Sequence, residues 1–232
     1  MKALVIALAL LVVAPAGAEA ASVTTMVVGK TRTLKGAKNV KLVKKRRVKV
    51  GGHRCTVAGN TALGALAALK MKLRLHDYGS CGRRPADASS LFVRGIGADR
   101  NRGQDGWVYK IGRRSPSTGA GDTSAKRLHR GDRVLWFWCH AQADGGCQRT
   151  LEATPDRSAA APGEQLRVTV RGYDNDGRGA LIEGATVTLG GTSALTGADG
   201  VATITVPAAG RLRLAAAKDG LVRSFPQVVR AG

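Results

Sequence analysis

The sequence predicts a mainly β protein, in which one helix packed on a mixed sheet is followed by a β-sandwich. Two observations carry this prediction. Residues 106–112 and 128–139 alternate large side chains at strand spacing and contain all three tryptophans. After residue 163, short alternating segments recur between glycine-rich turns, a pattern typical of a sandwich.

The first 20 residues have the pattern of a secretory signal peptide. Lys2 gives a positive start, and the apolar run Leu4–Val13 is too short to span a membrane stably. Ala18–Ala20 matches the small-residue pattern of a cleavage site. We therefore expect a protein that is secreted or held at the cell surface, with no transmembrane segment in the mature chain.

The positive charge is concentrated in the first part of the mature chain. Residues 22–150 hold 27 Lys and Arg against 7 Asp and Glu, a net of +20, whereas residues 151–232 hold 9 against 8, a net of +1. A surface with this charge attracts polyanions, so we expect an anionic cell-surface polymer or a small ligand as partner. The sequence thus predicts a cationic domain over 21–149, a linker over 150–163 and a sandwich domain over 164–232.

Four cysteines in an oxidising compartment indicate two disulfides. Three connectivities are open, and we favour Cys55–Cys81 and Cys139–Cys147, because the second pair encloses a polar turn over residues 140–146. The spacing lacks the close Cys and His pairs of a zinc site. We expect neither a metal nor a cofactor.

A strongly basic segment follows the first predicted strand, Val23–Val28. Residues 30–54 contain eleven basic and no acidic residues. Partial alternation in Val40–Val43 and Val48–Val50 favours a strand pair with a basic face, although a merely solvated surface is the alternative. The candidate polyanion-binding residues are Lys41, Lys44, Lys45, Arg46, Arg47 and Lys49.

The predicted helix begins near Asn60 or Thr61, either of which can cap its first turn. Leu63, Leu66 and Leu69 recur at helical spacing and mark its buried face. Further strands are expected from Leu73 and over Leu91–Ile96.

The aromatic strands have a predicted core side. Both faces of residues 134–139 are apolar, so this strand should be central and covered on each side. In residues 106–111, Lys110 shares its face with Val108, opposite the aromatic face. Four aromatic side chains are expected to belong to the core or, alternatively, to form a platform on which a ligand stacks: Trp107, Tyr109, Trp136 and Trp138.

The order strand, strand, helix, strands is that of a β-grasp-like domain. Residues 23–149 resemble bacterial extracellular domains related to the C-terminal domain of transcobalamin. The segments that carry the resemblance are Thr61–Leu69, Gly106–Gly112 and Leu128–Trp138. The resemblance implies a β-grasp-like fold. In transcobalamin the related domain covers one face of a bound corrinoid, but no ligand contact maps onto a residue here. Gly112-Arg113 also departs from the Asn-Gly common in that family.

The last part of the chain is predicted to contain strands at 165–170, 184–189, 212–216 and 222–229, and a turn followed by a strand over 196–207. Its Gly-Ala-x-Val-x-Leu and Asp-Gly-x-Ala motifs are similar to those of carboxypeptidase-regulatory and bacterial immunoglobulin-like domains, over residues 152–231. The resemblance implies an immunoglobulin/prealbumin-like sandwich that acts as a spacer, stalk or adhesion unit.

The chain carries no nucleophile elbow, zinc-protease motif or phosphate loop. Ser80–Arg83 partly resembles the cysteine loop of L,D-transpeptidases but lacks the adjacent histidine-glycine pair. We therefore predict a non-enzymatic secreted binding protein, whose cationic domain contacts an anionic polymer or ligand. The alternatives are a specific carrier of a corrinoid-like or other flat small ligand and, with less support, a cell-wall-modifying enzyme.

Overall fold

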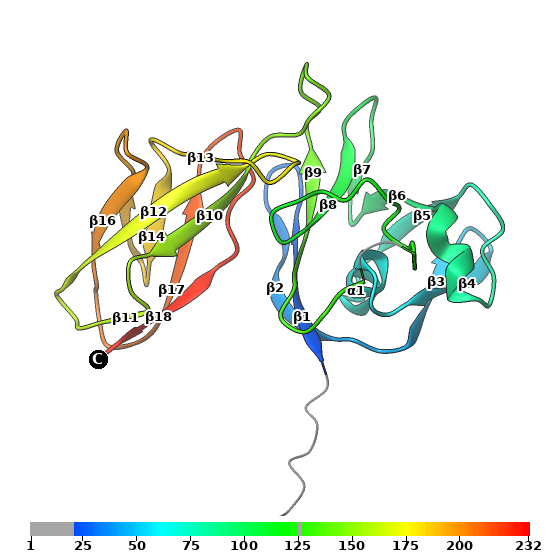
Figure 1. The fold of residues 1–232 in the computed structure, drawn as a ribbon, viewed down its shortest axis with the longest axis horizontal. Helices are drawn as coiled ribbons and strands as arrows, with labels where there is room; N and C mark the ends of the chain where they lie inside the picture. The colour runs from blue at the N-terminus through cyan, green and yellow to red at the C-terminus, as the bar shows by residue number, and fades with distance from the viewer. Residues whose placement is uncertain (1–20, 125–126) are drawn as a thin grey trace, which may run out of the picture.

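The structure is a computed structural model that describes residues 21–124 and 127–232, so the predicted signal peptide lies outside the described residues. The described chain is mainly β, as predicted. Figure 1 shows two β-rich parts side by side, here called the N-terminal part (residues 21–149) and the C-terminal part (residues 150–232). No helix among the described residues is long and apolar enough to cross a membrane.

A four-stranded mixed sheet forms the centre of the N-terminal part. In order across the sheet, its strands are β2 (Thr33–Lys41), β1 (Ser22–Val28), β9 (Arg133–Cys139) and β8 (Gly106–Ile111). The central pair β1 and β9 is parallel, and the two outer pairs are antiparallel. The strands predicted from Val23 and from the two aromatic segments are thereby confirmed.

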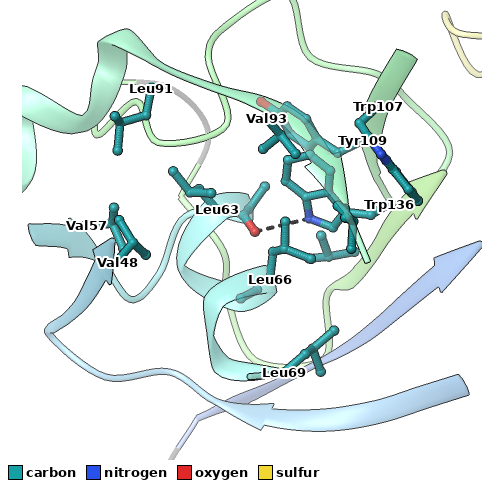
Figure 2. Packing of buried hydrophobic residues seen from close by; sticks show 14 of the residues in the cluster. Val48, Val57, Leu63, Leu66, Leu69, Leu91, Val93, Trp107, Tyr109 and Trp136 are labelled. Atoms are coloured by element: carbon teal, nitrogen blue, oxygen red, sulfur yellow. Dashed lines mark hydrogen bonds between the residues drawn. The ribbon is translucent and has the colours of Figure 1, made fainter. Parts of the chain in front are cut away.

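Helix α1 (Ala62–Ala68) packs on one face of this sheet, as the leucine spacing predicts. The side chain of Thr61 caps its start by accepting a 3.1 Å hydrogen bond from the main-chain N–H of Gly64. Leu63 and Leu66 face the aromatic strands, and the indole N–H of Trp136 donates a 3.2 Å hydrogen bond to the Ala62 carbonyl oxygen (Figure 2). This bond ties the helix to the sheet.

Two smaller sheets and one short 3₁₀ helix complete the N-terminal part. They consist of the hairpin β3 (Lys45–Val50) and β4 (His53–Ala58), the 3₁₀ helix η1 (Pro85–Ser90), and the sheet of β5 (Leu73–Asp77), β6 (Leu91–Ile96) and β7 (Asp99–Arg100). The predicted strands at Leu73 and Leu91–Ile96 are confirmed.

The predicted pairing of Val40–Val43 with Val48–Val50 is wrong. Instead β2 pairs with β1, and β3 pairs with β4, so residues 42–44 connect two different sheets. The reason is the turn after β3, where Gly51 has a φ of 56°, a conformation that glycine adopts without strain. This turn folds β4 back onto β3 and satisfies the main-chain hydrogen bonds of β3 locally.

The C-terminal part consists of two sheets with an apolar core drawn from both. The first contains β10 (Thr150–Pro155), β12 (Gln165–Tyr173), β13 (Gly179–Leu181) and β16 (Val201–Thr205). The second contains β11 (Ala159–Ala160), β18 (Gln227–Ala231), β17 (Gly210–Ala217), β14 (Thr186–Leu189) and β15 (Thr192–Leu195). The five strands predicted in this region each coincide with at least part of an observed strand.

Residues 150–163 were expected to be a linker, but most of them lie in strands, so this prediction is wrong. Strand β10 pairs along its whole length with β12, and β11 pairs with β18. Leu151 and Ala153 point into the core between the sheets, which gives β10 a buried face. Core burial and ladder hydrogen bonds therefore outweigh the Pro- and Ala-rich composition of this segment.

Strand β9 is covered on both faces, as its sequence predicts. Its even-numbered side chains, including Trp136, pack in the core with α1. On the other face Leu135, Phe137 and Cys139 pack in a second cluster with Val222 and Phe225 of the C-terminal part. The central sheet consequently lies between the helix and the sandwich (Figure 1).

Both disulfides of the structure are those favoured from the sequence, Cys55–Cys81 and Cys139–Cys147. The second bridge joins the end of β9 to the segment leading into β10, next to the contact between the two parts. Two disulfides suit an extracellular protein.

Candidate polyanion-binding groove

A basic groove with a volume of about 730 Å3 lies on the β3–β4 hairpin. We call it the basic groove. The residues that line it are Lys45, Arg46, Arg47, Arg54, Thr56 and Arg83. Five of the six carry a positive charge, and none carries a negative charge.

Side-chain alternation along β3 places three of its four cations outward, whereas Arg46 is half-buried on the valine face. Val48 and Val50 are buried, whereas Lys45, Arg47 and Lys49 are exposed. This alternation explains why so basic a segment folds as a strand at all, because its apolar residues share one face and join the core. The opposite face is left to the cations.

The pairing register brings one pair of like charges together across the hairpin: Lys49 lies opposite Arg54, whereas Arg47 lies opposite the neutral Thr56. Like charges directly opposite each other destabilise a strand pair, so an anion bound at Arg54 would relieve a repulsion that the free hairpin carries.

Arg83 reaches the groove through the disulfide Cys55–Cys81. The bridge joins β4 to the loop that carries Arg83, with the two Cα atoms 5.5 Å apart. Beside it, the main-chain N–H of Thr56 donates a 2.8 Å hydrogen bond to the carbonyl oxygen of Gly82. The loop is thus fastened to the hairpin at two adjacent points, which holds Arg83 near Arg54.

The groove cations have no carboxylate partners in residues 21–124 and 127–232: none of the five forms a salt bridge there. The nearest ion pair in sequence is Arg84 with Asp87, at 3.3 Å, just beyond Arg83. Unpaired guanidinium groups can each offer paired donors to a phosphate, sulfate or carboxylate. The groove can therefore hold an anion without first breaking an internal ion pair.

Three of the six predicted polyanion-binding residues line the basic groove, namely Lys45, Arg46 and Arg47. Lys41 lies instead in a neighbouring shallow depression with Lys35, Lys38 and Lys70. Arg46 reaches both, and one of its guanidinium nitrogens donates a 2.8 Å hydrogen bond to the Lys41 carbonyl oxygen. Lys44 and Lys49 are exposed on the same hairpin region but line neither depression.

Sequence reasoning missed two groove residues, Arg54 and Arg83. Arg54 closes the basic segment 30–54, and a hairpin turn at Gly51-Gly52 would have placed it opposite Lys49. No comparable signal exists for Arg83. Only the loop geometry around Cys81 brings it to the groove.

The four predicted stacking residues are all buried. The rings of Tyr109 and Trp136 stack at a centroid distance of 5.2 Å, and those of Trp107 and Trp138 meet edge to face at 5.8 Å. Trp107, Tyr109 and Trp136 also reach the wall of an apolar cleft of about 200 Å3. Trp138 does not line this cleft, and the ammonium group of Lys30 lies 4.2 Å from its ring centre.

His53 lies beside the first disulfide, with its Nε2 atom 3.5 Å from the Sγ of Cys81. Together with Cys55 they form the group of potential metal ligands found in the described part of the chain. A thiolate is the form of cysteine that binds metals and attacks substrates, and neither sulfur is a thiolate within a disulfide. The arrangement therefore fits a structural bridge.

The basic groove and the apolar cleft differ in the chemistry of the residues that line them. Cations without carboxylate partners indicate anion binding, and an aromatic-walled cleft indicates contact with an apolar ring. No family model, no curated protein and no solved structure matches this chain.

Proposed function

We propose that this is a secreted, non-enzymatic binding protein that captures an anionic surface polymer in the basic groove. The observation that carries the proposal is the convergence of five cationic side chains, without a carboxylate, on one groove. Lys45 and Arg54 come from the two strands of the hairpin within the basic segment 30–54, and Arg83 comes from the loop after Cys81, so the cluster depends on the fold as well as on the basic run.

A polymer is favoured over a single small anion because the cations extend beyond the groove. Lys41 continues the positive surface on one side, where it lies with Lys35 and Lys38, and Lys49 continues it along β3. A chain of regularly spaced phosphates, sulfates or carboxylates could contact several of these groups in turn. Such binding releases counterions and weakens steeply as salt is added.

For the two parts we propose the architectures that the sequence resembles. The strand order β2-β1-β9-β8, with a parallel central pair and α1 on one face, supports a β-grasp-like domain related to the transcobalamin C-terminal domain. The two-sheet arrangement of the C-terminal part supports an immunoglobulin-like or carboxypeptidase-regulatory-like spacer. In this proposal the sandwich holds the basic groove away from a neighbouring surface.

The test is titration of the protein with polyphosphate and with dextran sulfate at several salt concentrations. The groove variant combines Lys45→Ala, Arg47→Ala and Arg54→Ala, all at exposed positions. The control variant combines Arg167→Ala, Arg211→Ala and Arg213→Ala, which removes the same charge from exposed positions of the C-terminal part. We expect the groove variant to lose at least about tenfold in affinity at low salt and the control to lose much less.

Two outcomes would overturn this proposal. Equal losses in the groove variant and the control would show that net charge, not the groove, governs binding. An affinity that does not change with salt would show that ion pairing contributes little.

The apolar cleft favours a second candidate function, the carriage of a small flat ligand. Its walls include the rings of Trp107, Tyr109 and Trp136. Its volume of about 200 Å3 is below the roughly 300–1,000 Å3 of ordinary ligand pockets, which favours a single ring over a corrinoid. A change in tryptophan fluorescence on adding a neutral aromatic compound at high salt would support this function, and an unchanged spectrum would count against it.

A further inference from the structure

Tyr78 and Phe92 form an exposed aromatic pair in a protein with few aromatic residues. The chain has three Phe, three Trp and three Tyr, and these two have exposed fractions of 68% and 42%. The other aromatic side chains are buried or half-buried. The two exposed rings are neighbours, with centroids 6.1 Å apart. Adjacent exposed rings form a continuous apolar surface that a ligand can contact.

The structure holds these rings in place without burying them. Phe92 is paired across the β5–β6 ladder with His76, whose ring meets Tyr78 edge to face at 4.4 Å. The carboxylate of Asp77 accepts hydrogen bonds from the hydroxyl of Ser90 at 2.6 Å and from the N–H of Cys81 at 2.7 Å. These bonds lower the pKa of Asp77, the Ser90 bond most, so the carboxylate that fastens this loop stays ionised.

A ring surface held in this way suits binding, because less side-chain and loop freedom is lost when a ligand arrives. The same rings border a groove of about 590 Å3 between β6 and the edge strand β8. We call it the aromatic groove.

The aromatic groove is positively charged. Arg74, Arg94 and Arg100 line it, and its acidic lining residue is Asp105. In the described ranges, neither Arg94 nor Arg100 forms a salt bridge. The carboxylate of Asp105 already accepts a 2.9 Å hydrogen bond from the Ala141 N–H, which is the main reason that its pKa is lowered.

Asp105 is also paired with His140 at 3.1 Å, and in the described ranges it forms no salt bridge with an arginine. The aromatic groove thus presents two components to a ligand: exposed aromatic rings, and arginines without counterions beside them.

We propose that the aromatic groove binds single-stranded nucleic acid. Bases would stack on Tyr78 and Phe92, and the backbone phosphates would contact Arg94 and Arg100. Stacking platforms beside a positive groove are the combination by which proteins bind single strands with little sequence preference. A duplex is disfavoured because its bases are already stacked within the helix. The proposal goes beyond polyanion capture, because it requires a ring in the ligand and uses none of the residues that line the basic groove.

The experiment compares two labelled probes of equal length and charge by fluorescence anisotropy at one salt concentration. One is an oligothymidylate of about 12 nucleotides, and the other is the matching oligomer without bases. We expect the wild type to prefer the base-containing probe by roughly 5- to 150-fold. Tyr78→Ala with Phe92→Ala should remove this preference and leave the affinity for the abasic probe unchanged.

Two further variants sharpen the test. Tyr78→Phe keeps an aromatic ring and should keep the preference. Arg94→Ala with Arg100→Ala should weaken binding of both probes. The variant Lys45→Ala with Arg47→Ala and Arg54→Ala, which tests the proposed function, changes no residue of the aromatic groove and should leave the ratio of the two affinities intact. The ratio of the two probes therefore tests the aromatic groove, and the affinity for polyphosphate tests the basic groove.

Equal affinities of the wild type for the two probes would overturn the inference. So would a ratio that survives the loss of both rings. An acidic polysaccharide such as polygalacturonate that binds more tightly than oligothymidylate, and does so only when Tyr78 and Phe92 are present, would assign the aromatic groove to sugars and also overturn it.

Discussion

The Nζ atom of Lys110 donates a 2.8 Å hydrogen bond to the main-chain carbonyl oxygen of Tyr173, and this bond joins the two parts of the chain. Lys110 lies on β8 and is fully buried. Its Nζ also donates to the Thr150 hydroxyl at 3.0 Å and to the Asp174 carbonyl oxygen at 2.7 Å. The ammonium group thus uses its full capacity of three donors on acceptors of the C-terminal part.

This buried lysine predicts how stability depends on pH. Burial lowers the pKa of Lys110 from 10.5 to about 8, with Asp174 opposing the shift and Arg149 adding to it. Between these two pKa values the unfolded chain binds more protons than the folded chain, so the free energy of unfolding contributed by Lys110 rises with pH. In urea denaturation, the free energy of unfolding of the wild type relative to that of Lys110→Met should therefore be higher at pH 10 than at pH 7.

The control for this prediction is Lys72→Met, at an exposed position. The free energy of unfolding of Lys72→Met should differ from that of the wild type by the same amount at both pH values. If the difference in free energy of unfolding between the wild type and Lys110→Met is also the same at pH 7 and pH 10, the pKa of the buried lysine is not lowered.

Removal of the first disulfide should weaken both stability and polyanion binding. Cys55→Ala with Cys81→Ala is expected to lower the free energy of unfolding by about 2–4 kcal/mol, because the unfolded chain regains freedom. It should also lower the affinity for polyphosphate, since the loop bearing Arg83 then keeps only the hydrogen bond from Thr56 to Gly82 as its attachment to β4. Denaturation and titration of the same sample measure the two effects.

The second disulfide supplies the matched control. Cys139→Ala with Cys147→Ala should lower stability but leave the polyphosphate affinity of the folded protein unchanged, because this bridge lies away from the basic groove. If both double variants bind polyphosphate like the wild type, the disulfide has no role in placing Arg83.

The cap of α1 should have a measurable effect on stability. Thr61→Ala removes the side-chain oxygen that accepts from the Gly64 N–H and donates to the Ala58 carbonyl oxygen at 2.8 Å. We expect a loss of about 0.5–2 kcal/mol in urea denaturation followed by circular dichroism. Thr61→Ser keeps the hydroxyl and should recover most of the loss, whereas an equal loss in both variants would point to the missing methyl group.

Gly64 tests a case where tertiary contacts oppose helix propensity. In an isolated helix, alanine is favoured over glycine by about 1 kcal/mol. Here a Cβ atom at Gly64 would overlap the carbonyl oxygen of Ala58. We therefore expect Gly64→Ala to destabilise the protein by about 1–3 kcal/mol in thermal or urea denaturation.

Gly52→Ala is the control for Gly64→Ala, because a Cβ at Gly52 meets no atom within 4 Å. It should leave the free energy of unfolding nearly unchanged. A Gly64→Ala variant as stable as the wild type would mean that the start of α1 can shift away from Ala58.

The elements that could be predicted from the sequence are those whose pattern lies in consecutive residues. The alternation in residues 134–139 predicted a strand covered on both faces, and the core with α1 and the cluster with Val222 cover it. The leucine spacing after Thr61 predicted α1 and its cap in the same way. The linker prediction failed because composition does not report whether Leu151 and Ala153 face a core.

The candidate site was only half predictable for the same reason. Lys45 and Arg47 stand out in a local basic run, and their exposure follows from alternation in one strand. Arg83 joins them across a disulfide, and Tyr78 meets Phe92 only because of the β5–β6 pairing. The sequence placed Lys110 on the face of β8 opposite the aromatics, but it did not predict its burial or its acceptors.

By itself, then, the sequence determined the mainly β class, the helix and the concentration of positive charge, and it favoured the disulfide pairing that the structure contains. These depend on side-chain period, composition and cysteine spacing, which are properties of neighbouring residues. Only the tertiary structure decided which cations share a groove, which aromatic rings stay exposed and how Lys110 joins the two parts. Those relationships depend on how separate sheets stack and pair, and hydrophobic burial fixes that stacking across residues far apart in the chain.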